Sequence, residues 1–462
     1  MNDILIKLFK PLSIAFFTVV FFAASNSSIK ELEFTINQEK KLEAHYRKIH
    51  LFEKEKEEFG KWIQASASYP EIPSCGVIMV KNGEVMYMNT LRCSPDKLFM
   101  IASFTKTFTA ISILQLAEKG MLSLDDHISR YIDVSFENPR LKTDPITIRQ
   151  LLTHSSGLVD NESPEKTKGS MPFYIPEQKY PAGYLFSYCN QGYIILGHMI
   201  FEVTGIPLGD YVTHNIILPL EMKDSKAPDN TQGAAGIECS IRDLGNYLNM
   251  LASGGIYKKK RILSDRYFDE IFRESVFTPP GRNREYRGIA WRIWKSDGNI
   301  YSFNHAAHMD GAGGWMQIFP GSRVAYAFIS NPPVYETEKF YGFYQGMKYR
   351  LLKLASLLME DEKDPLEFTP TKPDGNDLKN YVGTYKNESD GSTINVWLND
   401  NDSLFARKSV TFQQYPLAAM SRSTFVYIYP GQNEKGELFD FVWRNGAVDG
   451  LGAKEGYFIK VE

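Results

Sequence analysis

Ser103 and Lys106 are the residues whose types and spacing point most directly to covalent chemistry. They lie near the start of an apolar run, FMIASFTKTFTAISILQLAEKG (residues 99–120), whose large side chains recur at helical spacing. Three residues apart on a helix, a hydroxyl and an amine project from the same face. An amine without its proton can take the proton of a serine, and a helix N-terminus directs backbone N–H groups at a developing oxyanion. The pattern therefore indicates acyl transfer to a serine.

A plain structural interpretation competes with this one. The Ser-x-x-Lys spacing also occurs at residues 27 and 30, 94 and 97, and 163 and 166, all in polar, Pro-containing or terminal segments. Only Ser103 opens a long amphipathic run, which ends at Gly120, where a left-handed helix C-cap is expected. In the plain interpretation Ser103 is a helix N-cap and Lys106 is a surface lysine.

Composition and charge indicate a globular protein. The chain has 462 residues, of which 43% are hydrophobic and 23% charged, and its net charge is −3. These proportions suit a protein that builds a core. Because no basic stripe is present to neutralise phosphates, we expect no nucleic-acid partner.

The N-terminus has the pattern of a targeting segment. Lys7 and Lys10 precede an apolar run over residues 12–24, and Ala23-Ala24-Ser25 forms a small-residue cleavage site. The run is shorter than the roughly 18 residues that usually span a bilayer. We therefore predict a signal peptide over residues 1–25 and a periplasmic or secreted protein. The alternative is an uncleaved segment, which would be the chain's only membrane association.

Four cysteines are too few and too scattered for a disulfide scaffold: Cys75, Cys93, Cys189 and Cys239. Cys75 and Cys93 flank a predicted hairpin and could pair in an oxidising compartment, although Cys93 lies beyond the stretch that the hairpin would align with Cys75. The sequence leaves this pairing open.

Periodicity divides the chain into a large α/β domain and a small all-β domain. Residues 26–64 are predicted as an N-terminal helical extension, and residues 65–360 as one discontinuous domain in which early and late strands share an antiparallel sheet. A linker over residues 361–375 precedes a barrel or sandwich over residues 376–462. The polar stretch over residues 159–183 is expected to be a functional loop.

Turn signals and apolar periodicity place the elements of the large domain. Asn82-Gly83 within residues 76–88 is a strong hairpin signal. Besides the Ser103 helix, helices are expected over residues 38–64, 124–131, 184–205, 239–254 and 338–358. Strands are expected over residues 288–294, 300–305, 315–319 and 324–330.

Two further motifs complete a family pattern. Tyr188-Cys189-Asn190 opens a turn-then-helix unit, and His305-Ala306-Ala307 ends a strand before a Gly-rich turn. With Ser103 and Lys106, these resemble the serine β-lactamase and penicillin-binding protein superfamily, in the branch whose second motif is Tyr-x-Asn. This branch holds class C β-lactamases, DD-peptidases, D-aminopeptidases and family VIII esterases. The resemblance covers roughly residues 70–350 and extends to three connecting segments, ITIRQLLTHSSGL (146–158), FSYCNQGYIILGHMI (186–200) and CSIRDLGNYLNML (239–251).

The resemblance implies a role for each motif residue. Ser103 would be the acylated nucleophile, and Lys106 the amine beside it. Tyr188 would exchange protons with Ser103 and with the leaving group, and Asn190 would orient substrate and lysine. The third motif maps onto His305 and Ala307, counted back from Gly311 and Pro320.

The third motif departs from the family pattern. Its last position is Ala307 where the family has Gly, and the N–H of this residue would form an oxyanion hole with that of Ser103. We expect the added methyl group to narrow the cleft. The implied fold is an α/β (α+β) β-lactamase/transpeptidase-like one, an antiparallel sheet flanked by helices with an additional all-helical region, and it implies no cofactor.

Competing chemistries find less support in the sequence. His305, His308 and Asp310 suggest a metal site or a triad, but residues 305 and 308 point to opposite faces of a strand and no further cluster supplies a third ligand. We therefore predict no metal. The Gly-x-Ser-x-Gly elbow of α/β-hydrolases is absent. His154, in the segment THSSGL, is predicted to be a structural residue in a hydrogen-bonded turn.

The sequence favours an exported serine hydrolase that forms an acyl-enzyme on a small-molecule or peptide amide, ester or lactam. A D-peptidase or esterase is favoured over a dedicated β-lactamase. The alternative is a catalytically weak or inactive penicillin-binding-like module that senses peptidoglycan or acyl ligands.

Overall fold

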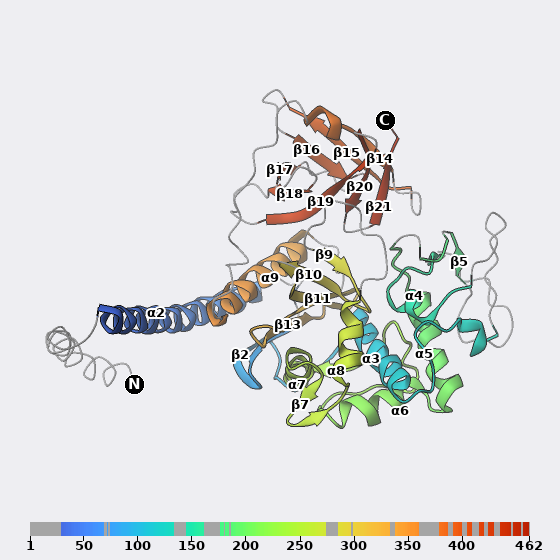
Figure 1. Ribbon diagram of the computed structural model, residues 1–462, viewed down its shortest axis with the longest axis horizontal. Coiled ribbons are helices and arrows are strands. Elements are labelled where there is room, and N and C mark those ends of the chain that lie inside the picture. Colours follow the sequence, from blue (N-terminus) through green and yellow to red (C-terminus); the bar gives the residue numbers. More distant parts are fainter. Residues whose placement is uncertain are drawn as a thin grey trace. The chain divides into compact units, whose positions relative to one another are not determined.

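The computed structural model of the chain describes most of residues 29–461 (Figure 1). Outside the described residues lie 1–28, 69–71, 73, 134–144, 161–175, 180, 184–185, 274–284, 297–298, 333–337, 360–377, 387–390, 400–403, 409–414, 420–423, 429–434, 445–446, 454–455 and 462. The predicted signal peptide, the linker and most of the predicted loop over residues 159–183 are among these.

The first described element is the long helix α2 (Ile29–Ala65), which begins nine residues before the predicted helix 38–64. By its contacts the chain divides into residues 1–58 and 59–462. The last turns of α2 belong to the second unit, where Phe59 stacks on Tyr87 with ring centroids 5.4 Å apart and Trp62 stacks on Phe343 at 5.5 Å. Aromatic stacking therefore anchors the end of this helix.

A seven-stranded antiparallel sheet has the strand order β2-β1-β13-β12-β11-β10-β9. Figure 1 labels five of its strands: β2, β13, β11, β10 and β9. Asn82 and Gly83 both take left-handed φ angles, +52° and +90°, as the tight turn between β1 and β2 requires. Strand β1 then pairs with the late strand β13, from Cys75 opposite Ser330 to Lys81 opposite Val324. The predicted discontinuous antiparallel sheet is confirmed. Its strands are β1 (Cys75–Lys81), β2 (Glu84–Leu91), β9 (Glu285–Arg287), β10 (Arg292–Ser296), β11 (Asn299–Met309), β12 (Ala312–Phe319) and β13 (Val324–Ser330).

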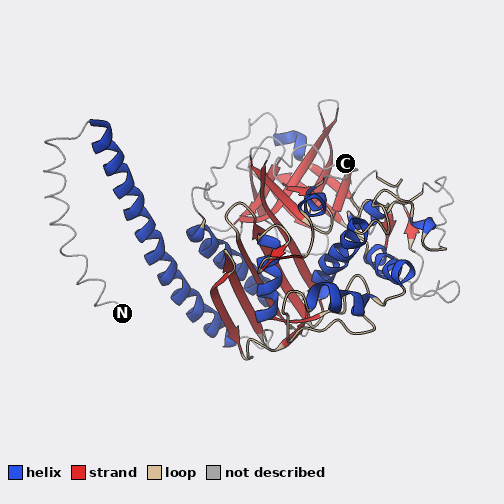
Figure 2. Ribbon diagram, turned by 60° about the horizontal axis from the view of Figure 1, so that its bottom comes forward, coloured by secondary structure: helices blue, strands red, loops and turns tan. Residues whose placement is uncertain are grey.

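Helices cover both faces of this sheet (Figure 2). A Cβ added at Gly76 of β1 would meet Ile241 of α7 (Ile241–Ala252), so the even-numbered face of β1 packs on α7. A Cβ added at Gly313, which pairs opposite Ser330 on the other face, would meet Phe340 of α9 (Glu338–Leu358). Buried apolar side chains therefore fill two helix–sheet layers.

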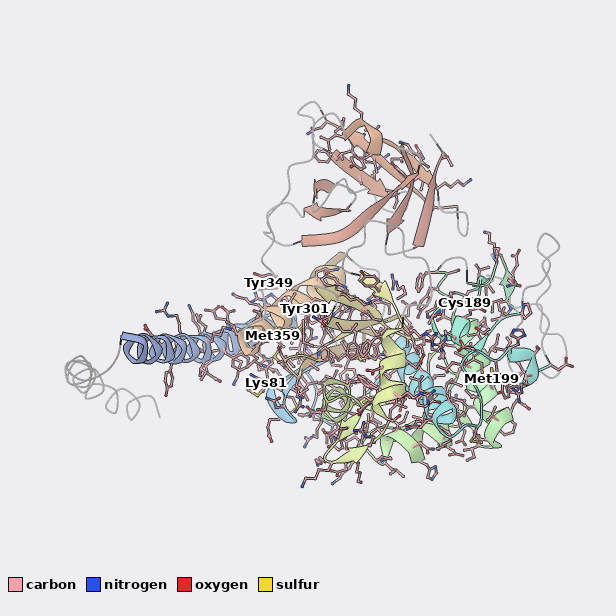
Figure 3. All side chains as sticks on the ribbon, viewed as in Figure 1. Lys81, Cys189, Met199, Tyr301, Tyr349 and Met359 are labelled. Carbon is pink, nitrogen blue, oxygen red and sulfur yellow. The ribbon has the colours of Figure 1, made fainter. Side chains whose placement is uncertain are left out.

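The remaining helices form the predicted helical region. They are α3 (Thr105–Glu118), α4 (Ile148–Leu152), α5 (Asn190–Thr204), α6 (Leu208–Val212) and α8 (Asp265–Asp269), with a π-helical stretch at Thr213–Ile217 and short 3₁₀ turns at Ser66–Ser68, Ala102–Phe104, Ile128–Arg130 and Glu270–Phe272. Short strand pairs join β3 (Leu98–Met100) to β6 (Glu238–Ser240), β4 (Leu158–Val159) to β5 (Glu177–Gln178), and β7 (Ile256–Tyr257) to β8 (Lys260–Arg261). Figure 3 labels Cys189, which directly precedes α5, and Met199, which lies within α5.

Two predicted elements differ from the structure. The helix predicted over residues 124–131 is a single 3₁₀ turn at Ile128–Arg130, because His127 has an extended backbone (φ −70°, ψ 137°) and forms a β-bridge with Thr147. The strand predicted over residues 288–294 begins only at Arg292, because Ala290 takes a left-handed φ of +63° in a tight turn.

The C-terminal residues form a closed antiparallel barrel, one of the two predicted alternatives. The barrel closes where β14 pairs with β21, with Tyr385 opposite Lys460. Its strands are β14 (Gly383–Lys386), β15 (Thr393–Leu398), β16 (Leu404–Lys408), β17 (Tyr415–Ala419), β18 (Thr424–Ile428), β19 (Lys435–Arg444), β20 (Ala447–Ala453) and β21 (Gly456–Lys460), and they follow the 3₁₀ turn Leu378–Tyr381.

No single helix among the described residues is long and apolar enough to cross a membrane. The helix pair Asn190–Thr204 and Leu208–Ile217, bent by 81°, passes the same length and composition test when taken together.

We predict that Gly233→Ala destabilises the protein by about 1–3 kcal/mol, the usual cost of overpacking. An added Cβ would lie 1.8 Å from the backbone oxygen of Tyr193, and neither backbone segment can yield cheaply. Urea unfolding measures the change. Gly342→Ala is the matched control, because its Cβ meets nothing within 4 Å on an exposed helix position and alanine favours helix. Equal free energies of unfolding for the two variants would contradict this packing.

Candidate active site

Ser103 lies in the 3₁₀ turn η2 (Ala102–Phe104), directly before α3. Ala102 holds a left-handed φ of +45°, an uncommon conformation for a residue with a side chain. The expected N-cap role of Ser103 is wrong, because Phe104 occupies the N-cap position of α3 and makes no side-chain bond there. The Ser103 hydroxyl instead faces Lys106 and Tyr188.

Lys106 is fully buried, so the alternative of a surface lysine is also wrong. Its Nζ donates to Ser103 Oγ at 3.1 Å and to the backbone oxygen of Ala234 at 3.1 Å. None of the ion pairs among the described residues includes Lys106. The amine therefore depends on two neutral acceptors, one of which is the candidate nucleophile.

Tyr188 comes from a distant segment to the same hydroxyl. Its phenol oxygen lies 3.0 Å from Ser103 Oγ as the hydrogen-bond donor, and its ring centroid lies 5.0 Å from Lys106 Nζ. The side chain is 43% exposed, so solvent and small molecules reach the phenol. The structure thus brings together a hydroxyl, a buried amine and an accessible phenol, which is the arrangement that proton exchange at a serine nucleophile requires.

Asn190 lies at the first position of α5, and its side chain is held by Asp160. The Asn190 amide Nδ2 donates to Asp160 Oδ2 at 2.8 Å, and the same carboxylate accepts the backbone N–H groups of Asn190 and Gln191. Asp160 therefore caps the helix in place of Cys189, which makes no side-chain cap. Among the described residues the Asn190 amide bonds Asp160, and it forms no hydrogen bond with Lys106, which the resemblance has it orient. Sequence reasoning missed Asp160, since a lone acidic residue after a strand carries no spacing signal.

His305 and Ala307 lie on the part of β11 that extends past its neighbour. Pairing with β10 ends where Arg292 lies opposite Asn304, so residues 305–309 continue beyond that strand, and β11 contacts the η2 turn there. The His305 ring meets Phe104 edge-on, with centroids 6.3 Å apart. Ala307 is fully buried within the apolar core. The expected narrowing of the cleft needs its methyl group exposed at the site, and the methyl group is not exposed.

Burial keeps the histidines around the site uncharged. It lowers the pKa of His305 to about 3, with the nearby Lys106 charge as the next cause. Burial and Lys106 also hold the pKa of His154 well below its ordinary value. Both imidazoles are therefore neutral at physiological pH.

His154 lies next to the site, and the sequence predicted its structural role but not its contacts with the Tyr188 segment. It is buried in a hydrogen-bonded turn, as predicted, but its ring also lies 4.4 Å from that of Tyr188 and its Nδ1 accepts the backbone N–H of Cys189. It therefore contacts the segment that carries the phenol.

The alternative metal site is not assembled. Among the described residues no group of three or more His, Cys, Asp or Glu side chains could hold a metal ion. His308 packs against the ring of Tyr344 at 4.8 Å, on the opposite strand face from His305.

The four cysteines are free thiols, and Cys93 Sγ donates to the backbone oxygen of Cys75 at 3.3 Å instead of bonding its sulfur.

Comparison with known proteins identifies the family. The family described as Beta-lactamase matches residues 61–345, more than half of the chain. The chain belongs to this family. The resemblance inferred from the motifs is thereby confirmed, and members of this family are serine hydrolases.

Individual relatives of the β-lactamase family match shorter stretches. Protein flp of Staphylococcus aureus (strain MW2) is 32% identical over 170 residues, 33% of this chain and 34% of that protein. Penicillin-binding protein 4* of Bacillus subtilis (strain 168) is 26% identical over 178 residues, 32% and 37% of the two chains. The chain therefore spans about a third of the length of these curated relatives.

Solved structures share the fold at low identity. The crystal structure of SurE superposes with a TM-score of 0.58 at 18% identity, covering 88% of this chain and 99% of that one. D-amino acid amidase from Ochrobactrum anthropi SV3 gives 0.50 at 20% identity, covering 65% and 98%. Both support the β-lactamase/transpeptidase-like fold.

We predict that His305 makes the protein acid-sensitive. The unfolded imidazole titrates near ~6.5 and the folded one near about 3, so below ~6.5 the unfolded state binds a proton that the folded state refuses. The free energy of unfolding therefore falls as the pH drops, by about 2 kcal/mol from this group at pH 5. Urea unfolding at pH 7.5, 6 and 5 measures the slope.

His305→Gln should lose that part of the slope, because glutamine does not titrate. His214→Gln, at an exposed position on the π-helical stretch, should keep the wild-type slope. An unchanged slope in His305→Gln would contradict the assignment.

Proposed function

We propose that this chain is an exported serine hydrolase that forms an acyl-enzyme at Ser103 on amide, ester or lactam substrates. The observation that carries the proposal is the convergence on one hydroxyl: Lys106 Nζ lies 3.1 Å and the Tyr188 phenol oxygen 3.0 Å from Ser103 Oγ. Two proton carriers at hydrogen-bond distance allow the hydroxyl to become a nucleophile and allow the proton to move on to a leaving group.

In the acylation step, Ser103 Oγ attacks the substrate carbonyl carbon while its proton passes to the Lys106–Tyr188 pair. The bond to the leaving nitrogen or oxygen then breaks, and Tyr188, which is the exposed member of the pair, returns the proton to that atom. The step requires one member of the pair, amine or phenol, to begin without the proton it will take, so that it accepts the Ser103 proton and passes the same proton on to the leaving atom. The products of this step are the acyl-enzyme ester and the free amine or alcohol.

In the deacylation step, the same pair takes a proton from a water that attacks the ester. Bond cleavage releases the acid and restores the Ser103 hydroxyl. The backbone N–H of Ser103 is the proposed oxyanion donor in both steps. The resemblance adds the N–H of Ala307, a fully buried residue on the end of β11, the strand that contacts η2. Asn190, two residues after Tyr188 and held by Asp160, is the proposed substrate-orienting side chain.

A D-peptidase or esterase is the form of this activity that we favour over a dedicated β-lactamase. Solved structures of this fold include a D-amino acid amidase and a D-stereospecific amidohydrolase, which supports an amide of a D-amino acid as a test substrate. Export rests on the N-terminal pattern of Lys7, Lys10 and the apolar run before Ala24. The proposed partner is accordingly a small-molecule or peptide acyl substrate outside the cytoplasm.

We predict that a fluorescent acyl-type fluorophosphonate labels the wild-type chain and not Ser103→Ala. Ser94→Ala is the matched control, because Ser94 and Lys97 have the same spacing but the Lys97 amine bonds Ser74 instead. Mass spectrometry of the adduct identifies the serine. Label on Ser103→Ala, or equal turnover of a p-nitrophenyl ester by that variant, would contradict the proposal. Ligand binding without any hydrolysis across D-amino-acid amides, esters and a cephalosporin would favour the sensing module.

We predict that Tyr188→Phe lowers kcat by about 10²–10⁴-fold, the range expected when a positioned proton carrier is removed. The ring stays, so packing is retained. Tyr193→Phe is the control: its ring also lies near Lys106, at 5.9 Å, but its hydroxyl bonds the backbone oxygen of Leu152 and not Ser103. Steady-state kinetics on the best substrate measure both variants. A kcat for Tyr188→Phe within a few-fold of wild type would exclude the phenol as the proton carrier.

A further inference from the structure

His154 bonds to the chain on both sides of Tyr188. Its backbone oxygen accepts the N–H of Ser187 at 2.7 Å, and its Nδ1 accepts the N–H of Cys189 at 3.2 Å. One residue therefore fixes the backbone immediately before and immediately after the phenol. His154 itself adopts a left-handed backbone, with φ at +54°.

The imidazole also fills the space behind the phenol. Its centroid lies 4.4 Å from that of Tyr188 and 4.9 Å from that of Tyr193, with interplanar angles of 30° and 37°. Phe186 meets the same ring edge-on at 5.7 Å. Tyr188 is 43% exposed on its outer side, whereas His154 is only 6% exposed, so the inner face of the phenol rests on this ring.

Only the neutral ring with its proton on Nε2 can make these contacts. Nδ1 accepts a hydrogen bond, so it carries no proton, and Nε2 is buried with no partner among the described residues. Burial and the charge of Lys106 lower the pKa of this imidazole, which favours the neutral form. The only side-chain hydrogen bond of this ring among the described residues is therefore the one that Nδ1 accepts from the N–H of Cys189.

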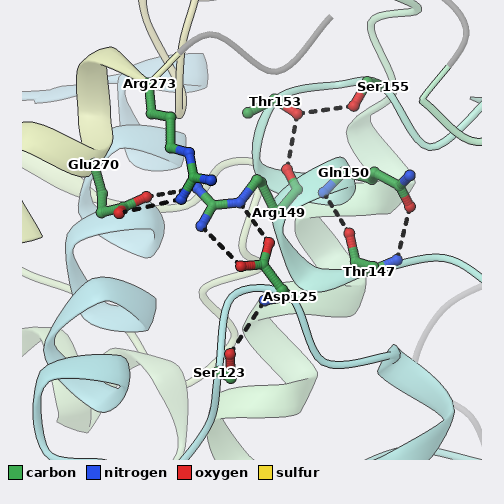
Figure 4. A network of polar contacts seen from close by, with 9 residues as sticks. All are labelled: Ser123, Asp125, Thr147, Arg149, Gln150, Thr153, Ser155, Glu270 and Arg273. Atoms are coloured by element: carbon green, nitrogen blue, oxygen red, sulfur yellow. Dashed lines mark hydrogen bonds and ion pairs between the residues drawn. The ribbon is translucent and has the colours of Figure 1, made fainter.

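A polar network around α4 holds the segment in place (Figure 4). The Arg149 guanidinium, whose side chain is only 12% exposed, bonds Asp125 and Glu270 at 2.7 Å each. Thr147 and Gln150 form a capping box at the start of α4.

The residues on either side of His154 are tied to this helix. Thr153 Oγ1 donates to the backbone oxygen of Arg149 at 2.8 Å, and the hydroxyls of Thr153 and Ser155 lie 2.9 Å apart. The backbone N–H of Ser155 donates to the oxygen of Gln150 at 2.8 Å. The left-handed residue is thus clamped between two anchored neighbours.

We propose that His154 is the positioning residue for Tyr188, holding the phenol oxygen at Ser103 through its Nδ1 acceptor, which fixes the backbone beside the phenol. The inference rests on the proposed acyl transfer at Ser103. In this proposal the α4 network and the turn after α4 align the Tyr188 phenol with Ser103. The alignment matters because a displacement of about 1 Å can cost about 10²-fold in rate.

Two variants separate the acceptor from the ring. His154→Asn keeps an acceptor oxygen and tolerates a left-handed φ, while His154→Phe keeps an aromatic ring and loses the acceptor. We expect kcat to fall by about 10²-fold in the Phe variant, with KM within about 3-fold of wild type, and to stay within about 5-fold of wild type in the Asn variant. His198→Phe is the control, because His198 pairs with Glu202 on α5. Thermal unfolding of each variant accompanies the kinetics.

A merely structural histidine would lower the melting temperature of both variants and leave the kcat of the folded fraction unchanged, which would overturn the inference. An Asn variant as slow as the Phe variant would also overturn it. If the Phe variant does not fold, His154→Gly decides, because glycine accepts φ at +54° without strain. Added imidazole should raise the kcat of the Gly variant at least about 10-fold, and no response would overturn the inference.

Failure of the proposed function gives a different result. A wild-type chain that is not acylated at Ser103 removes the reaction itself. Acylation of wild type with unchanged kcat in all three His154 variants leaves the reaction standing and removes only the positioning role.

Discussion

The burial of the Lys106 amine is the constraint on which the site depends. A polar group removed from water costs several kcal/mol unless it is hydrogen-bonded, and here the acceptors are Ser103 Oγ and the Ala234 backbone oxygen. The left-handed Ala102 turns the serine toward the amine. Close packing of Gly233 on the Tyr193 backbone brings the next residue, Ala234, within reach. The left-handed backbone at Ala102 and the close packing at Gly233 therefore both help to supply the hydrogen-bond acceptors of Lys106 Nζ.

The same amine sets the electrostatics of its surroundings. The charge of Lys106 adds to burial in lowering the pKa of His154 and of His305, so neither imidazole competes with it for a positive charge. The helical region contributes the hydroxyl, the amine and the phenol, and the sheet contributes the extended end of β11. One apolar core runs from the strands into the helices and joins the two parts.

Strong local signals made much of this architecture predictable. Asn82-Gly83 fixed a hairpin, the apolar period after Ser103 predicted α3, and residues 338–358 were predicted as a helix with the bounds that α9 has. The motif residues Ser103, Lys106 and Tyr188 could be selected because their letters recur at family spacing. Asp160 and the bracketing role of His154 could not, because a cap or a support is defined by backbone groups that meet only in three dimensions. The N-cap expectation for Ser103 failed for the same reason: its competing partner, Tyr188, lies 85 residues away.

The pairing of β1 with β13 has a consequence for the order in which the protein forms. The β1–β13 ladder cannot form until Ser330, the partner of Cys75, has been synthesised. Contacts between residues so far apart in the sequence form slowly. During synthesis the early hairpin presents an unpaired edge, which is a template for association with other chains. A nascent or truncated chain that stops within the helical region carries Ser103, Lys106 and Tyr188 without the sheet that seats them. The three residues are therefore seated only after the last strands of the sheet are made, and a chaperone that shields β1 until then would suit this topology.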